Sequence, residues 1–169
     1  LATLLASGSP QVRLLCARTL GVVGNRSSLV VLQEALEDPD SSVRIESINA
    51  LDNLLERLPS VGDATVADAI SLVKLRLQDT EDGVVIAAIR FLVNRVASGY
   101  QETEVNEILP TLVALGLDNS ALTDVAASAI AELDTEQAMQ MLLEPMLEQD
   151  FAQKRPRALQ MLMTVAKHA

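Results

Sequence analysis

Aromatic residues are almost absent from this 169-residue chain, which has no Trp, one Tyr and two Phe. Glycine and proline, with seven and six residues, are too few for a turn-rich all-β domain. Apolar residues nevertheless make up 49% of the chain. The core must therefore be built from aliphatic side chains, which suits helices packed closely on helices.

Several other features are missing. No apolar run approaches the roughly 20 residues that a helix needs to cross a bilayer, and no secretory signal is recognisable. The single cysteine, Cys16, cannot form an internal disulfide, so we expect a cytoplasmic protein. The chain begins at Leu1 without a methionine, and we expect it to be a fragment of a longer protein.

Positive charge is scarce as well. Thirteen Lys and Arg stand against 23 Asp and Glu, which gives a net charge of −10. Such a field repels phosphate backbones and attracts basic proteins. We therefore expect a protein or peptide partner, with basic character favoured, and neither nucleic acid nor a membrane surface.

A repeated segment is the main signal that is present. Residues 7–20 (SGSPQVRLLCARTL) and 38–51 (DPDSSVRIESINAL) share a polar turn, a Val-Arg pair and a helical apolar pattern. A third copy at 79–92 (DTEDGVVIAAIRFL) has Val85 in place of the arginine. Two weaker copies keep the spacing and the apolar pattern and end at Ile130 and Leu162.

Each copy is expected on the second helix of an antiparallel helix pair. The apolar periodicity predicts first helices over 27–37, 63–78, 103–116 and 135–148, with only a short segment, 1–6, before the first turn. No segment alternates polar and apolar residues between hairpin turns, so no strand is predicted. The prediction is an all-α fold of about five helix pairs, the first incomplete, in a single domain over residues 1–169.

These residues resemble a known family. The segment 20–44, with LGVVGN, LEDPD and Val43-Arg44, resembles short bacterial HEAT repeats of the phycobilin-lyase type. The segment 108–113 (ILPTLV), followed by Asp118, is similar to the first helix of a longer HEAT repeat. The resemblance covers almost the whole chain and implies a right-handed α-α superhelix, a HEAT-like solenoid.

In that family a loop aspartate and the arginine after the valine commonly form a ladder of ion pairs between neighbouring repeats. Four residues match it here, namely Asp38, Asp79, Arg13 and Arg44. Three positions depart from it, namely Ser7, Val85 and Thr123. We expect the ladder to be broken and its role to be structural.

Candidate catalytic chemistry is sparse. His168, the only histidine, is next to the last residue and has no convergent partners in the sequence. Cys16 aligns with Ser47 and Ala88 on the packing side of the helices, so a buried small residue is expected. The basic run 154–157 is interpreted as a solvated helix start that opposes the helix dipole, with an anion contact as the alternative. We predict no enzyme activity, no metal and no cofactor.

The resemblance also implies that second helices line the concave side of the solenoid. The repeat register then aligns two columns of mostly polar residues on that side. The predicted partner-binding residues are Arg18, Asn49, Asn53, Arg90, Asn94, Ser128, Glu132 and Gln160. Asn and Arg side chains suit the recognition of peptide and helix surfaces. The predicted function is a non-catalytic protein–protein interaction or scaffold module.

The alternative is an accessory solenoid of an enzyme, either a chromophore-lyase-like subunit or a HEAT-like DNA glycosylase. The glycosylase is disfavoured because it requires a basic, aromatic-bearing face, and this chain has a net charge of −10 and no Trp. The lyase subunit stays open. A fused catalytic or cofactor domain in the full-length gene product would favour it, whereas further repeats would favour the scaffold.

The two ends of the repeat array are expected to expose apolar side chains, because a solenoid normally closes with polar capping repeats. At the first end these are Leu1, Leu4 and Leu5, and in the last helix they are Met161, Leu162 and Val165. Self-association through the ends is the expected consequence.

Overall fold

The computed structural model describes residues 3, 5, 8–58, 64–98, 103–133, 135–146 and 151–167. In these residues the secondary structure is helical, without strands, which confirms the predicted all-α fold class. The helices are α2 (Pro10–Val23), α3 (Ser27–Ala35), α4 (Ser41–Arg57), α5 (Ala64–Leu75), the 3₁₀ helix η1 (Arg76–Gln78), α6 (Asp82–Ala97), α7 (Thr103–Asp118), α8 (Thr123–Leu133), α9 (Thr135–Met146) and α10 (Arg155–Val165). The predicted helix over 1–6 lies mostly outside the described residues, and its two described members, Thr3 and Leu5, are helical. Leu5 is buried, so the prediction that it is exposed at the first end is wrong.

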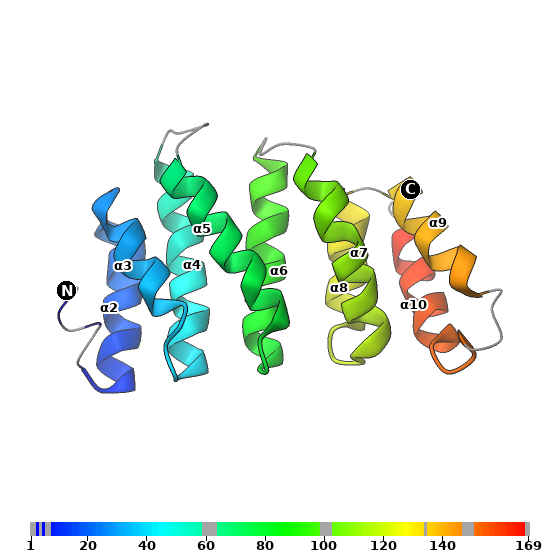
Figure 1. Cartoon of the computed structure of the whole chain (residues 1–169), viewed down its shortest axis with the longest axis horizontal. Helices are drawn as coiled ribbons and strands as arrows, with labels where there is room; N and C mark the ends of the chain where they lie inside the picture. Colours follow the sequence, from blue (N-terminus) through cyan, green and yellow to red (C-terminus); the bar gives the residue numbers. More distant parts are fainter. Residues whose placement is uncertain are drawn as a thin grey trace. The chain divides into compact units, whose positions relative to one another are not determined.

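The chain divides into two compact units, Leu1–Leu92 and Val93–Ala169. In the first unit α2 packs beside α4, and the first helices α3 and α5 form a second layer over them (Figure 1). This is the antiparallel helix-pair arrangement that the repeated segment predicts. The core between the two layers is aliphatic, with Leu29, Leu32, Ile48, Leu51 and Leu54 fully buried.

Local sequence signals explain where the helices of this unit begin and end. Ser9 caps α2, because its hydroxyl accepts a hydrogen bond from the Val12 N–H at 3.4 Å, and Pro10 follows in the first turn. Asp40 caps α4 in the same way, accepting from the Ser42 N–H at 2.9 Å. These caps set the start of α2 and of α4 directly after the polar turn of each repeat.

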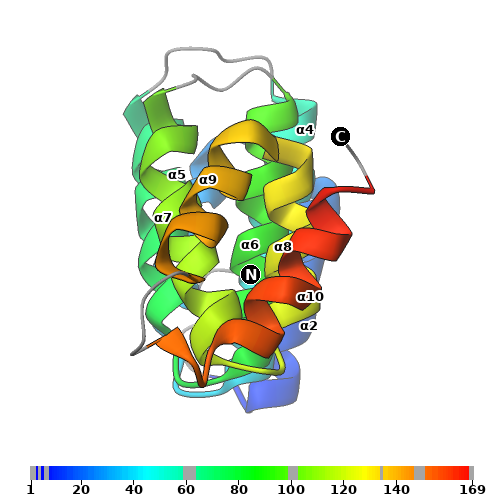
Figure 2. The same cartoon turned by 90° about the vertical axis from the view of Figure 1, so that its right-hand side faces the viewer.

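The second unit repeats the arrangement with α7 over α8 and α9 over α10 (Figure 2). Its buried side chains include Leu109, Leu112, Ile130, Leu142 and Met161. Met161 and Val165 were expected at an open end, but both are fully buried, so that prediction is wrong. The outward positions of α10 are instead held by Leu159 and Met163. No helix in the described part of the chain is long and apolar enough to span a membrane.

Candidate functional site

The predicted binding residues of the first unit all lie at the surface. Arg18 on α2, Asn49 and Asn53 on α4, and Arg90 on α6 are exposed. Asn94, one helical turn beyond Arg90 on α6, is exposed too. Because α2, α4 and α6 are equivalent helices of successive repeats, we define the side of α2, α4 and α6 that carries Arg18, Asn49, Asn53 and Arg90 as the second-helix face.

An ion pair connects two helices across this face. The Arg18 guanidinium donates through Nε to Glu46 Oε1 and through Nη2 to Glu46 Oε2, both at 3.0 Å. The Arg18 side chain remains 59% exposed, so the pair contributes at most about 1 kcal/mol to stability. Glu46 is a site residue that the sequence reasoning missed. Its signal was present, since Glu46 precedes Asn49 by three residues and therefore shares its side of the helix.

The other polar groups of the face are not engaged in this way. Among the residues that the structure describes, the side chains of Asn49, Asn53 and Arg90 have no hydrogen-bond or ion-pair partner. Two amides one turn apart on α4 and a guanidinium on the next second helix are thus available to a ligand. Their role in binding stays a prediction.

In the second unit, Ser128 and Glu132 on α8 and Gln160 on α10 are exposed, as predicted. Gln160 Nε2 donates to Asp124 Oδ1 at 2.7 Å, which links α10 to α8. Asp124 was also missed, although it lies one turn before Ser128 on the same side of α8. In both units, therefore, polar side chains of neighbouring second helices bond to each other.

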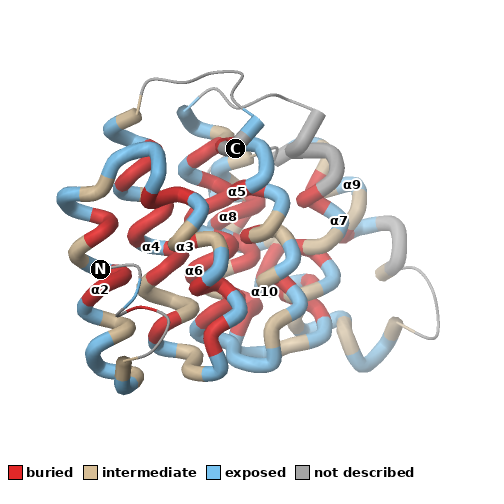
Figure 3. Tube along the Cα trace, turned by 60° about the vertical axis from the view of Figure 1, so that its left-hand side comes forward, coloured by how far each residue is buried: buried red, intermediate tan, exposed pale blue. Residues whose placement is uncertain are grey.

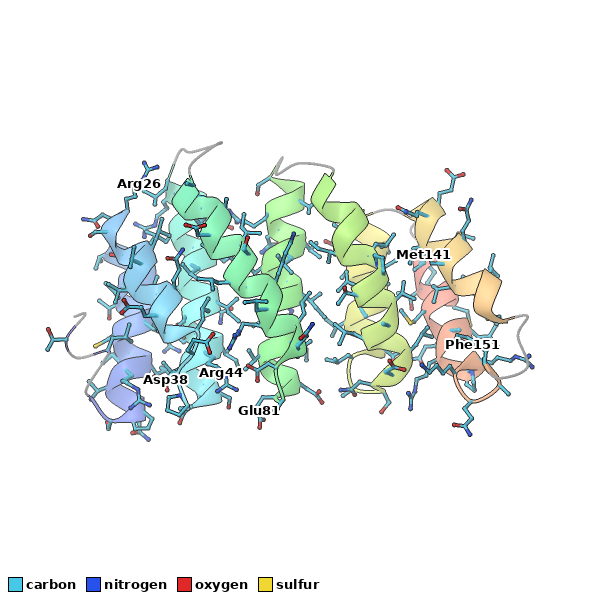
Figure 4. All side chains as sticks on the ribbon, in the orientation of Figure 1. Arg26, Asp38, Arg44, Glu81, Met141 and Phe151 are labelled. Carbon is cyan, nitrogen blue, oxygen red and sulfur yellow. The ribbon has the colours of Figure 1, made fainter. Side chains whose placement is uncertain are left out.

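The predicted Arg–Asp ladder is present at two steps. Arg13 donates to both oxygens of Asp38 at 2.6 and 2.8 Å, and Arg44 to both oxygens of Asp79 at 2.9 and 2.7 Å. Each arginine also binds a carbonyl of its own preceding turn, Gly8 O for Arg13 and Asp38 O for Arg44, both at 2.8 Å. Asp38 and Arg44 accordingly lie close together at the same end of the helices (Figure 4).

Both ladder carboxyls have a lowered pKa in the folded chain. Burial by itself would raise the pKa of Asp38, but the hydrogen bonds from Arg13 and from the Asp40 N–H outweigh it, and the pKa is lowered. Burial likewise opposes ionisation of Asp79, while Arg44 and the Glu81 N–H favour it, and its pKa is also lowered. The ladder thus consists of charged, largely buried pairs that tie one repeat to the next.

The ladder breaks where the sequence departs from the pattern. Val85 occupies the arginine position on α6 and is buried, so no ion pair can form there. Thr123 occupies it on α8, where its buried hydroxyl donates to Gly116 O at 2.8 Å and caps the end of α7.

The basic run 154–157 has a different role from the one expected of it. Lys154 pairs with Asp118, Arg155 donates to Met146 O at 3.1 Å, and Arg157 donates to Leu117 O at 2.8 Å and to Asp118 O at 3.0 Å. These carbonyls end α7 and α9, where the helix dipole is negative. The interpretation as a solvated, mismatched helix start is therefore wrong, because the cations neutralise the C-terminal ends of two other helices.

The remaining candidates for a functional site are Cys16, His168, a metal-binding cluster and a cavity. Cys16 is buried, as predicted for a packing residue, and His168 lies outside the described residues. No cluster of His, Cys, Asp and Glu suited to a metal occurs in the part of the chain that was described. A cavity of about 350 Å³ opens beside Arg13 and Asp38, but both charges are already paired with each other. The second-helix face is therefore the candidate site.

Comparison with known proteins gives the family and the fold. Residues 1–94 match the protein family described as HEAT repeats. No curated protein sequence matches the chain. Two crystal structures of engineered proteins from the Northeast Structural Genomics Consortium are similar to it, both with a TM-score of 0.59. One is 21% identical over 99% of this chain and 78% of its own, and the other is 22% identical over 98% and 79%.

Proposed function

We propose that this chain, which belongs to the HEAT-repeat family, is a non-catalytic interaction module that binds another protein or a peptide on its second-helix face. The observation that carries the proposal is the trio Asn49, Asn53 and Arg90. These side chains are exposed, are aligned by the repeat and lack partners within the described residues.

The chemistry of the trio suits a peptide ligand. Each asparagine amide offers donors and an acceptor that can pair with main-chain N–H and C=O groups, and the arginine offers a planar fork of donors for carboxylates and carbonyls. Arg18 adds to this set, because an exposed ion pair worth at most about 1 kcal/mol can be exchanged for a contact with a ligand. In the second unit we propose Asn94, Ser128, Glu132 and Gln160 as further partner-binding residues, because all four are exposed.

The net charge of −10 favours a partner with basic character. Such a field accelerates encounter with an oppositely charged protein and weakens as salt is added. We propose a cytoplasmic location and a partner that is neither a nucleic acid nor a membrane. The buried thiol of Cys16 supports a non-catalytic role, because a nucleophile has to reach its substrate. The resemblance of residues 20–44 to phycobilin-lyase-type repeats makes an accessory subunit of a chromophore lyase the alternative.

Site-specific crosslinking tests the proposal. A photo-crosslinking residue placed at Asn53 should capture the partner in cells, whereas the same residue at Asp68, on the first helix α5, should not. With the captured protein purified, Arg90→Glu should weaken binding by about 1–3 kcal/mol, the range for losing a hydrogen bond to a charged group. The stability of the chain should be nearly unchanged, because Arg90 is exposed.

The matched control is Arg26→Glu. It makes the same change of charge at an exposed arginine beside α3, away from the second-helix face. Equal binding by Arg90→Glu and wild type, or equal losses in both variants, would overturn the proposal. Equal binding by Arg90→Glu and wild type would mean that the partner binds on another surface. Equal losses in Arg90→Glu and Arg26→Glu would mean that only the net charge of the chain affects binding.

A further inference from the structure

The two ladder steps of the first unit are built on equivalent turns. The N–H of Asp38 donates to Ala35 O, and the N–H of Asp79 donates to Arg76 O, both at 3.2 Å. Each aspartate pairs with an arginine at the same position of a second helix. Ala35 at the end of α3 is therefore equivalent to Arg76, which directly follows α5.

Arg76 is a second guanidinium at its ladder step. Its Nη2 donates to Glu37 Oε1 at 2.6 Å, and its Nη1 donates to Leu36 O at 3.3 Å. Burial opposes ionisation of Asp79, but hydrogen bonds and the positive charges of Arg44 and Arg76 outweigh it and lower the pKa of Asp79. Two arginines therefore stabilise the carboxylate of this step.

At the first ladder step, alanine takes the position of this second arginine. Burial opposes ionisation of Asp38 too, and Arg13 supplies the positive charge that lowers its pKa. The cavity of about 350 Å³ lies beside this step, with Ala35 in its wall. A methyl group thus replaces a long cationic side chain, and the cavity beside it has the size that small ligands occupy.

The wall of the cavity combines apolar and charged side chains. The apolar residues that line it are Leu5, Val31, Ala35 and Pro39. The charged residues that line it are Arg13, Glu34, Glu37 and Asp38. Arg13 pairs with Asp38, and Glu37 pairs with Arg76, so each of these pairs is neutral. The remaining carboxylate, that of Glu34, gives the cavity a negative charge.

Glu34 is available to a ligand. Within the described residues its carboxylate has no hydrogen-bond or ion-pair partner. Glu34 is exposed, whereas Ala35 beside it is buried, in line with the mixed burial along α3 (Figure 3). The residue equivalent to Glu34 one repeat later is Leu75, which precedes Arg76. A carboxylate thus accompanies the cavity, whereas an apolar residue accompanies the arginine.

We infer that this cavity binds an alkyl guanidinium group, the chemistry of an arginine side chain. The bound guanidinium adds to the Asp38 step the second positive charge that Arg76 adds to the Asp79 step. It pairs with Glu34, the carboxylate of the wall that has no other partner within the described residues. The site lies at the end of α3, so the inference does not depend on binding at the second-helix face.

The rest of the wall matches the remainder of such a ligand. The methylene groups of the stem lie against Val31 and Ala35 while the charged head stays near water, as is usual for arginine. A guanidinium is favoured over an ammonium, because its planar fork can donate to a carboxylate and a carbonyl at the same time. Arg76 does this with Glu37 and Leu36 one repeat later.

Titration of the isotope-labelled chain, followed by NMR, tests the inference. N-acetyl-arginine amide should shift the amide signals of Glu34 and Ala35 in a saturable way, with a Kd of about 1 mM, as expected of a ligand of this size. N-acetyl-citrulline amide has a similar shape without the charge and should bind about fivefold more weakly, the value of an exposed ion pair. Agmatine presents the guanidinium without a peptide main chain. The tighter binder of agmatine and N-acetyl-arginine amide shows whether the site takes a free small molecule or a side chain of a protein.

Two variants and a matched control locate the site. Ala35→Arg should remove binding, because it supplies from within the chain the group that Arg76 supplies one repeat later. Ala67→Arg, at an exposed alanine of α5, adds the same charge and should bind the ligand like the wild type. Glu34→Gln should weaken binding about fivefold and should fold normally, because Glu34 is exposed. Circular dichroism checks the folding of each variant.

Three results would overturn the inference: a wild type without saturable shifts well above the expected Kd, equal affinities for the arginine and citrulline compounds, or unchanged binding in Glu34→Gln. Equally tight binding of N-acetyl-lysine amide would overturn the assignment to a guanidinium. Unchanged binding in a folded Ala35→Arg would mean that the ligand binds on another surface. If Ala35→Arg does not fold, Glu34→Gln and the citrulline compound still decide the question.

Discussion

The backbone of Ala50 occupies the space beside Gly21. A Cβ atom on Gly21 would lie 2.7 Å from the Cα atom of Ala50 and 2.8 Å from its Cβ atom. The α2 and α4 helices therefore approach at a distance that only glycine allows at this position. Arg57 strengthens the same seam, because its Nη2 donates to Gly21 O at 2.7 Å.

This contact predicts the effect of Gly21→Ala. In an isolated helix the change would stabilise by about 1 kcal/mol, because alanine is the better helix former. Here the obstacle is backbone rather than a flexible side chain, so the two helices must separate. We expect a net loss of about 1–3 kcal/mol in the free energy of unfolding, the usual range for overpacking, measured by urea titration.

Gly83→Ala is the control. A Cβ atom there would meet only the end of the Ile45 side chain, at 3.1 Å, and Gly83 is exposed in the first turn of α6. Ile45 can move by a few tenths of an ångström, so the helix propensity of alanine should dominate and the variant should be as stable as the wild type or more so. If both variants gain stability equally, the close packing of α2 on α4 is wrong.

A second prediction concerns the helical register of α4. Leu51 is fully buried between the helix layers, so Leu51→Ala should cost about 2–5 kcal/mol. Asn49→Ala, two residues earlier on the exposed side, should change stability by no more than about 0.5 kcal/mol. Similar shifts of the urea midpoint in the two variants would contradict the register.

A third prediction compares two bidentate ion pairs that differ in burial. The Arg44 and Asp79 side chains are largely buried, whereas Arg18 is exposed in its pair with Glu46. A double-mutant cycle to alanine should give a coupling of about 1–3 kcal/mol for the buried pair, because either single change leaves a charge without its partner. The exposed pair should give less than about 1 kcal/mol. Equal couplings would mean that burial does not strengthen the ladder.

The sequence predicted most of the first unit correctly because its repeats are strong there. A conserved Val-Arg register within the chain is enough to place Leu51 and Cys16 inside, and Asn49 and Arg90 outside. The repeat register is less reliable for α10, where few residues identify the repeat. It predicted Met161 and Val165 as exposed, whereas Leu159 and Met163 are the exposed residues. Met161 is buried because its side chain lies against Gly116 of α7, and α10 also packs on α8.

Long-range contacts were the other source of error. Arg157 binds carbonyls that lie 40 and 39 residues earlier in the chain, at the end of α7. A local charge pattern cannot indicate which helix end a cation will reach, so the dipole of α10 alone did not predict that these cations bind the ends of α7 and α9. The Arg18–Glu46 bridge is also a contact between two helices, and the pattern within either helix alone does not predict it.

The last prediction concerns acid. The folded chain lowers the pKa of both Asp38 and Asp79, whereas an unfolded aspartate titrates at about 3.9. Below neutral pH the unfolded state therefore takes up protons on these groups before the folded state does. Their contribution to stability is complete above the unfolded pKa and is lost as the pH falls toward the lower folded values. The free energy of unfolding should decline steeply below about pH 5.

Replacing both aspartates isolates this effect. The double variant Asp38→Asn/Asp79→Asn should be less stable at pH 7, because Arg13 and Arg44 lose their charged partners. Its stability should then fall less steeply with acid than that of the wild type, so that the two curves converge at low pH. Asp68→Asn, at an exposed position of α5, should leave the wild-type slope unchanged. Urea titrations across a pH series measure both slopes. Parallel curves for wild type and double variant would show that the ladder carboxylates do not set the acid limit of the fold.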